Sequence, residues 1–170
     1  DALLNAAAAL KRRGRDDIKL VLIGQGKLKA GLQARVACEG LDNVVFHDPV
    51  NKAALAGLMA AADLGLQVLA NVPAFYYGTS PNKFFDYLSA GLPVLINYPG
   101  WLADILVEHS CGFVVSPESS AAFADQLEQA AADRGALKVM GQRSQLLAKT
   151  HFDRMNLADQ WVDWVTGVRT

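Results

Sequence analysis

Short apolar segments alternate with amphipathic helical segments along the chain, and this alternation restricts the fold more than any other feature. Apolar strands are predicted at Ile18–Gly24, Asn43–His47, Asp63–Leu69, Pro93–Asn97 and Gly112–Val115. Helical segments separate them, and strand–helix–strand units make right-handed crossovers between parallel strands. We therefore expect an α/β fold, with a Rossmann-like parallel sheet covered by helices on both faces.

The predicted helices complete this pattern within one domain. They span Asp1–Arg13, Leu28–Glu39, Asn51–Ala62, Pro81–Ala90, Trp101–His109, Ser120–Asp133, Ala136–Lys149 and Arg154–Val168. Asn51 is expected to cap the third helix and Gly91 to close the fourth. A chain of 170 residues can bury the core of one such domain but is short for two. A single domain is therefore expected over residues 1–170.

The charges do not indicate a nucleic-acid partner. The formal net charge is -1 at pH 7, and the basic residues are scattered apart from the run Lys11-Arg12-Arg13. That run lies at the expected end of a helix, where cations interact favourably with the helix dipole. We expect no binding of nucleic acid.

The cysteines and the longest apolar stretch indicate neither a metal site nor a membrane span. Cys38 and Cys111 lack metal-ligand spacing, so no metal is expected, and both are predicted to be buried free thiols in a reducing cytoplasm. The stretch Ala53–Ala70 contains Asp63 near its middle, where a charge costs about 3 kcal/mol in a membrane. A surface helix running into a buried strand explains the stretch better.

The start of the fourth helix carries the strongest chemical signal. Ser80 is a favourable N-cap, and Pro81 loses nothing at the first helical position by lacking an N–H. The N–H groups of Asn82, Lys83 and Phe84 would then lack helical partners at the positive end of the helix dipole. Together with the Lys83 ammonium, they predict a site for a diphosphate.

Asp86 extends this site by one helical turn. It follows Lys83 by three residues and Asn82 by four, so the three share one helix face. The helical rise places Asp86 roughly 5–6 Å along the axis from the phosphate end. This is the step from a diphosphate to a ribose, whose vicinal hydroxyls a carboxylate can accept. The alternative is an ordinary capped helix with a solvated face, but Lys83, Asp86 and the position after a parallel strand together favour the nucleotide site.

The segment Ser80–Leu95 resembles the signature of the retaining GT-B glycosyltransferases of the glycosyl transferases group 1 family. In that signature an acidic residue, here Asp86, is followed by a small-residue turn, Gly, Pro and Val. Weaker similarity covers Val21–Gly26, Asn43–Phe46, Ala61–Leu66 and Cys111–Val115. The Ser-Pro-Asn-Lys variant is most similar to transferases that build bacterial surface polysaccharides, lipopolysaccharide among them, from UDP-linked amino sugars.

The resemblance implies roles for particular residues. Asp86 matches the second of two glutamates that the family separates by seven intervening residues, and it is expected to hold the ribose. The first glutamate, which contacts the donor sugar, falls at Gly78 and is absent. The family's Arg and Lys pair on the diphosphate follows a first strand that is expected to precede this chain. Lys83 is therefore expected to carry more of the phosphate charge, and it is the predicted catalytic residue.

The resemblance also implies the surroundings of the domain. The chain is expected to be the nucleotide-sugar-binding half of a longer protein, with the acceptor site in an N-terminal domain outside it. The partners would be the nucleotide sugar, which is a substrate, with no separate cofactor, and that N-terminal domain. The location would be cytoplasmic, with peripheral contact to the inner membrane through the missing half, and the isolated chain would be inactive.

Weaker motifs complete the predicted donor site. Gly24-Gln25-Gly26 starts like a dinucleotide fingerprint, but Lys29 occupies the third glycine position, which disfavours a nicotinamide dehydrogenase. The glycines still allow a ligand close to the backbone, and His47–Val50 could bracket a base or form a plain turn. The predicted donor contacts are Gly24, Gly26, Val50, Gly78, Ser80, Pro81, Asn82, Lys83, Phe84 and Asp86.

The remaining candidates have plainer explanations. His109 and His151 are interpreted as surface or capping residues, since no Ser, His and Asp arrangement is readable. Trp161 and Trp164 share a helix face and are predicted to pack in a core or between domains.

We expect retaining glycosyl transfer in which the domain stabilises the departing nucleoside diphosphate. A GT-B-like sugar-nucleotide epimerase would need further acidic and His residues around the donor. A receiver-like flavodoxin domain would need clustered acidic residues at an early strand end, which Ile23–Gly26 does not supply.

Overall fold

The computed structural model of the chain describes residues 1–167, and its elements follow the predicted order. They are α1 Ala2–Arg12, β1 Leu20–Ile23, α2 Lys29–Glu39, β2 Val44–His47, α3 Lys52–Ala60, β3 Gly65–Gln67, η1 Pro73–Phe75, α4 Asn82–Ser89, β4 Val94–Ile96, α5 Trp101–Glu108, β5 Gly112–Val114, α6 Ser120–Ala132, α7 Arg134–His151 and α8 Arg154–Thr166. The single 3₁₀ turn η1 was not predicted. The predicted end of the last helix, Val168, lies outside the described residues.

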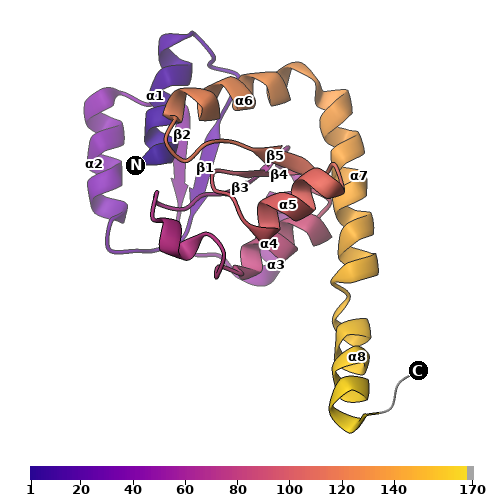
Figure 1. The fold of residues 1–170 in the computed structure, drawn as a ribbon. Helices are drawn as coiled ribbons and strands as arrows, with labels where there is room; N and C mark the ends of the chain where they lie inside the picture. The colour runs from indigo at the N-terminus through magenta and orange to yellow at the C-terminus, as the bar shows by residue number, and fades with distance from the viewer. Residues whose placement is uncertain (168–170) are drawn as a thin grey trace.

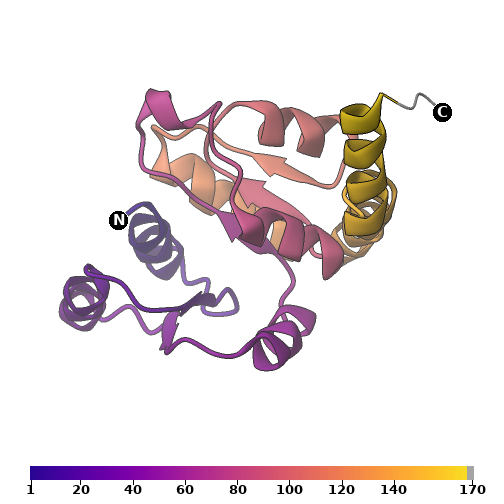
Figure 2. The same cartoon turned by 90° about the horizontal axis from the view of Figure 1, so that it is seen from below.

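The strands are parallel, as expected, but they are grouped in two sheets rather than in one. β1 pairs with β2, with Leu20 opposite Val44, and a second sheet has the order β3-β4-β5. Figure 2 shows the purple segments around β1 and β2 on one side of the molecule and the later strands on the other. The chain therefore runs outward from β1 to β2 in one sheet and from β3 to β5 in the other.

Two hydrophobic clusters hold the layers together. The first joins both sheets through Leu20, Val44 and Leu95 and is covered by α1 and α6. An ion pair from Arg13 to Asp125, 2.7 Å long, adds to the contact between these two helices. The second cluster lies between β4, α4, α5 and α7. Figure 1 shows α6 beside α1 and α7 descending past the second sheet.

The end of α4 is set by Gly91, as predicted. Gly91 has φ +73°, its N–H bonds to Leu88 O at 3.0 Å, and the N–H of Leu92 bonds to Tyr87 O at 2.9 Å. This is a Schellman motif, in which a left-handed residue satisfies the last carbonyls of a helix. The turn also brings Gly91 O against α7, since a Cβ on Gly141 would lie 2.2 Å from it.

Other local predictions have mixed outcomes. Asn51 caps α3 as predicted, accepting a hydrogen bond of 2.9 Å from the N–H of Ala54. Cys111 is buried, and burial raises the pKa of its thiol to about 11. The prediction that Cys38 is buried is wrong, because α2 covers α1 from outside and buries none of its own residues.

The last helix, α8, extends away from the body of the molecule (Figure 1) and buries none of its residues. Trp161 is 63% exposed and Trp164 is 79% exposed. Core packing of these two residues within the chain, one of the two predicted roles, is therefore wrong. Within residues 1–167, no helix is long and apolar enough to cross a membrane.

Candidate functional site

The predicted diphosphate site lies at the start of α4, which begins one residue later than expected. Pro81 is the N-cap, with φ −79° and ψ 133°, and no side chain caps the helix, so the prediction that Ser80 is the N-cap is wrong. An extended proline cannot be the first helical residue, and its carbonyl accepts the N–H of Phe84 at 3.0 Å. Of the three N–H groups predicted to be free, those of Asn82 and Lys83 have no partner within residues 1–167.

Phe84 therefore offers no free N–H to a ligand. Its side chain is fully buried, and its ring packs edge-on against Phe85 at 5.4 Å between centroids. Phe84 anchors the first turn of α4 in the second hydrophobic cluster. Phe84 therefore supports the start of α4 through its buried ring, and its N–H is engaged with Pro81 O.

Lys83 is a cation with no protein partner. Among the described residues its ammonium forms neither an ion pair nor a hydrogen bond. The residue as a whole is exposed, yet partial burial of its side chain lowers the pKa of the ammonium. An unpaired, partly desolvated cation in the same helical turn as two free backbone N–H groups is an arrangement that an anion would complete.

Asp86 lies on the open face of α4. Its side chain is exposed and has no hydrogen-bond or ion-pair partner in the described part of the chain. Phe84 and Leu88 point into the core, and the ring of Tyr87 packs over Gly65 in β3. The predicted arrangement of Lys83 and Asp86 on one accessible face is thus compatible with the structure.

The loop before α4 is fixed by contacts from neighbouring elements. The buried ring of Tyr76 stacks on Tyr98, with 5.9 Å between centroids and 17° between planes. The indole Nε1 of Trp101, at the start of α5, donates to Thr79 O at 3.2 Å. Gly78 and Ser80 are exposed on this loop. The start of α4 is therefore held in place from α5 and from the segment after β4.

Buried amides connect the ends of β3 and β4. Asn97 accepts from the N–H of Leu69 at 2.8 Å and donates to Leu69 O at 2.9 Å. Gln67 donates from Nε2 to the Tyr98 hydroxyl at 3.0 Å, while its Oε1 is buried without a protein partner. Sequence reasoning missed both amides, whose only signal was a polar residue at the end of an apolar strand.

A second group of predicted contacts lies at the ends of β1 and β2. Gly24 and Gly26 are in the β1–α2 loop, and Val50 is in the β2–α3 loop, where it is exposed. The Lys29 ammonium joins these loops, donating to Gly24 O at 3.0 Å, to His47 O at 3.2 Å and to Asp48 Oδ1 at 2.6 Å. Sequence reasoning considered Lys29 only as the residue that breaks a fingerprint.

Both groups follow the carboxyl ends of parallel strands, where α/β sheets bind their ligands. The family of the chain can be assigned from comparison with known proteins. The sequence model of the glycosyl transferases group 1 family matches residues 1–133. The chain belongs to this family.

Solved structures similar to this glycosyltransferase chain have the same fold. WaaG, a glycosyltransferase involved in lipopolysaccharide biosynthesis, is 27% identical with a TM-score of 0.74, over 98% of this chain and 43% of WaaG. HepE of Anabaena, solved with UDP and glucose, is 22% identical with a TM-score of 0.76, over 98% of this chain and 44% of HepE. The C-terminal domain of LpcC from Francisella tularensis is 21% identical with a TM-score of 0.71, over 90% of this chain and 78% of that domain.

These comparisons fix the scope of the assignment. The chain spans less than half the length of WaaG and HepE. A comparison with curated protein sequences finds no match. The fold and the family are thus shown for this chain, and what WaaG and HepE contain beyond the matched length has no counterpart in the comparison.

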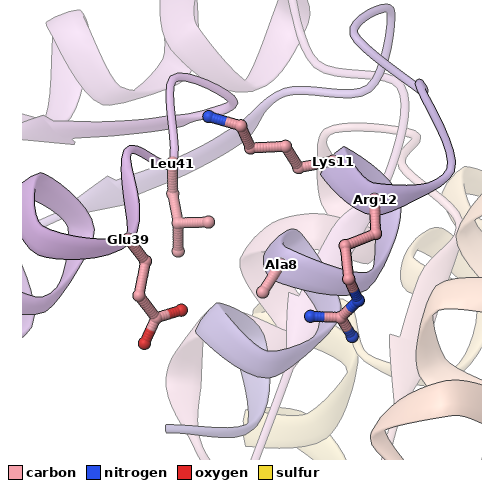
Figure 3. Close-up of a pocket in the computed structure, with 5 residues that line it drawn as sticks. All are labelled: Ala8, Lys11, Arg12, Glu39 and Leu41. Atoms are coloured by element: carbon pink, nitrogen blue, oxygen red, sulfur yellow. The ribbon is translucent and has the colours of Figure 1, made fainter.

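One hollow of the glycosyltransferase chain lies away from this site. It has a volume of about 440 Å³ and is lined by Ala8, Lys11, Arg12, Glu39 and Leu41. Figure 3 shows these side chains around the ends of α1 and α2. Those helices end where β1 and β2 begin, so the hollow lies at the amino edge of the strands. Ligands of parallel α/β sheets bind at the carboxyl edge, which favours the α4 site.

The two histidines of the sequence analysis, His109 and His151, lie near one another. The rings of His109 and His151 have 5.2 Å between centroids, at the ends of α5 and α7. No group of three or more metal-ligating side chains occurs in the part of the chain that the structure describes.

Proposed function

We propose that this glycosyltransferase chain binds the donor, a UDP-linked sugar, with its diphosphate at the start of α4. The observation that carries the proposal is the unpaired Lys83 ammonium in the same helical turn as the free N–H groups of Asn82 and Lys83. Asp86 follows on the same helix face and would accept the ribose hydroxyls. The complexes of HepE with UDP, a protein of the same fold, support this choice of nucleotide.

In the proposed reaction, the bond between the anomeric carbon and the diphosphate oxygen breaks, and the electron pair leaves with the nucleoside diphosphate. The helix N–H groups and Lys83 oppose the charge that develops on that oxygen. Because these groups are in place before the reaction, they stabilise the transition state without reorganisation. An acceptor hydroxyl then forms the new glycosidic bond with retention of configuration, and its proton passes to the departing diphosphate oxygen.

The further parts of the proposal concern the whole protein. The donor would be a UDP-linked amino sugar, the acceptor a surface polysaccharide or glycolipid, and the enzyme a hexosyltransferase. The lipopolysaccharide role of WaaG, at 27% identity, supports this class. The acceptor site would lie in an N-terminal domain, with peripheral contact to the inner membrane from the cytoplasm. The present chain would bind the donor but not transfer the sugar.

Calorimetry on the chain tests the donor proposal. UDP should bind at one site, and NAD at the same concentration should not. Lys83→Ala should lower the affinity for UDP far more than the affinity for uridine, because the ammonium acts on the diphosphate. This loss of UDP affinity should be smaller in high salt. The control is Lys138→Ala, on an exposed position of α7. The proposal would be contradicted if the chain bound NAD but not UDP. It would also be contradicted if Lys83→Ala lowered the affinities for uridine and UDP equally.

A further inference from the structure

The Lys29 ammonium connects two strand ends that no other side chain joins in residues 1–167. Its three protons lie within reach of four acceptors: Gly24 O, His47 O, Asp48 Oδ1 and, at 3.5 Å, Gln25 Oε1. The side chain is 15% exposed, whereas that of Asp48 is 88% exposed. The N–H of Gly24 also bonds to His47 O at 3.2 Å. We call these contacts of Lys29 the strand-end clamp.

The position of Lys29 is unfavourable apart from the clamp. Lys29 is the first residue of α2, where a cation opposes the positive end of the helix dipole. The acceptors of the clamp offset this cost and that of removing the ammonium from water. The contacts of the clamp therefore stabilise Lys29 at this helix start, and they fix the β1–α2 and β2–α3 loops relative to one another.

The clamp lies beside the place where the order of the strands reverses. The chain runs outward from β1 in one sheet and from β3 in the other, and ligands bind at such a reversal. The β3–α4 loop supplies the anion site on one flank, which leaves the β1–α2 and β2–α3 loops for the other end of the nucleotide. The backbone N–H groups of Gln25, Gly26 and Val50 have no partner within the described residues.

We propose that Lys29 is a positioning residue for the nucleobase, which holds the Gln25–Gly26 and Val50 backbone in the arrangement that recognises the base. This inference rests on the proposed function, since it concerns the base of the same nucleotide. Lys29 does not contact the phosphates, because its three protons are engaged. Preorganised backbone groups bind without the cost of ordering the loops, so loss of the clamp lowers both affinity and selectivity.

The experiment compares Lys29→Met with Lys27→Met in the chain. Lys27 lies two residues away, is exposed, and has no ion pair or hydrogen bond in the described part, so its removal deletes the same charge but not the clamp. Calorimetry measures the affinities for UDP, CDP, ADP and GDP, and thermal unfolding checks the fold. Asp48→Asn, which weakens one arm of the clamp, serves if Lys29→Met does not fold.

The wild type should bind the diphosphate of one base more tightly than the other three. Lys29→Met should lower the affinity for that diphosphate by about fivefold or more. The ratio of its affinity to the affinities for the other diphosphates should also become smaller. Lys27→Met should retain the preference, and Asp48→Asn should narrow it less than Lys29→Met. The inference is overturned if Lys29→Met, or Asp48→Asn in its place, keeps the wild-type ratio of affinities among the four diphosphates. It is also overturned if the affinities for all four diphosphates fall equally, which would indicate that Lys29 acts on the phosphates. Failure of the wild type to bind any diphosphate would instead overturn the proposed function.

Discussion

Lys83 carries a charge that the fold itself does not use. Its ammonium has no partner among the described residues, and burial lowers its pKa below the ordinary value. A lowered lysine pKa means that the unfolded chain binds the proton more tightly than the folded chain. The charged form is therefore a cost to folding that is fully present below the folded pKa. The cost is relieved as the pH rises from the folded to the unfolded pKa.

We therefore expect Lys83→Met to be more stable than the wild type at neutral pH. The difference in unfolding free energy should shrink as the pH approaches the ordinary lysine pKa of about 10.4. Denaturant unfolding at pH values from 7 to 10 measures this difference, with Lys138→Met, at an exposed position of α7, as the control for the loss of a lysine side chain. A variant less stable than the wild type at pH 7 would show that Lys83 supports the fold instead of a ligand.

Asp86 provides a prediction in which the two roles of a residue diverge. As an exposed ribose ligand, Asp86→Asn should change the unfolding free energy by no more than about 0.5 kcal/mol. Binding of UDP should fall by roughly tenfold, because charge-assisted bonds to the ribose hydroxyls are lost. A 2′,3′-dideoxy UDP lacks those hydroxyls and should bind both proteins equally. If Asp86→Asn lowers the affinity for the dideoxy compound as much as that for UDP, the carboxylate does not hold the ribose.

At this scale the sequence predicts residues that act through local helix geometry and misses those that act across the fold. Lys83 and Asp86 could be placed on one face because helical spacing relates them. The contacts of Lys29 with Gly24 and His47 depend on the pairing of β1 with β2, which no local pattern encodes. The orphaned Oε1 of Gln67 was invisible for the same reason.

The elements themselves were predicted in the right order, and their ends were less certain. The cap of α3 by Asn51 and the end of α4 at Gly91 were predicted because both depend on residues within one turn. The start of α4 was one residue off, because the extended backbone of Pro81 is fixed by the loop before it. That loop is in turn held by Tyr98 and Trp101, which follow much later in the chain.

The crossing of α4 and α7 yields a prediction at the scale of elements. A Cβ on Gly141 would lie 2.2 Å from Gly91 O, so the helices must separate to admit it. Gly141→Ala should therefore destabilise the chain by about 1–3 kcal/mol, as overpacking does. Because α4 carries Lys83 and Asp86, UDP affinity should also fall.

Gly57 in α3 is the matched control. A Cβ there meets no atom within 4 Å, so Gly57→Ala should stabilise the chain by about 0.5–1 kcal/mol through helix propensity alone. Chemical denaturation of both variants measures the contrast. If both replacements changed the unfolding free energy in the same direction, α4 and α7 would not be in the close contact described.

In the molecule as a whole, the sequence predicted the α/β class but not the grouping of strands in two sheets. Alternation of strands and helices requires parallel pairing, and each pair is parallel. Which strands become neighbours depends on packing between distant segments, such as Leu20 with Leu95 in the first cluster. The exposure of α8 was equally unreadable, since Trp161 and Trp164 have the spacing of a buried face.

The last prediction concerns how α8 relates to the body of the molecule. Asp153 caps this helix through bonds of 3.0 Å from the N–H groups of Met155 and Asn156, but none of its residues is buried. A helix of 13 residues that packs against nothing is only marginally stable in water. In α7, by contrast, Leu137 and Leu147 are buried, and so is Gly141, where the helix crosses the end of α4. Hydrogen exchange should therefore be faster in α8 than in the buried part of α7 by about 100-fold or more. Equal protection in dilute solution would show that α8 packs against the body, and protection that grows with protein concentration would show that its exposed tryptophans contact a second copy.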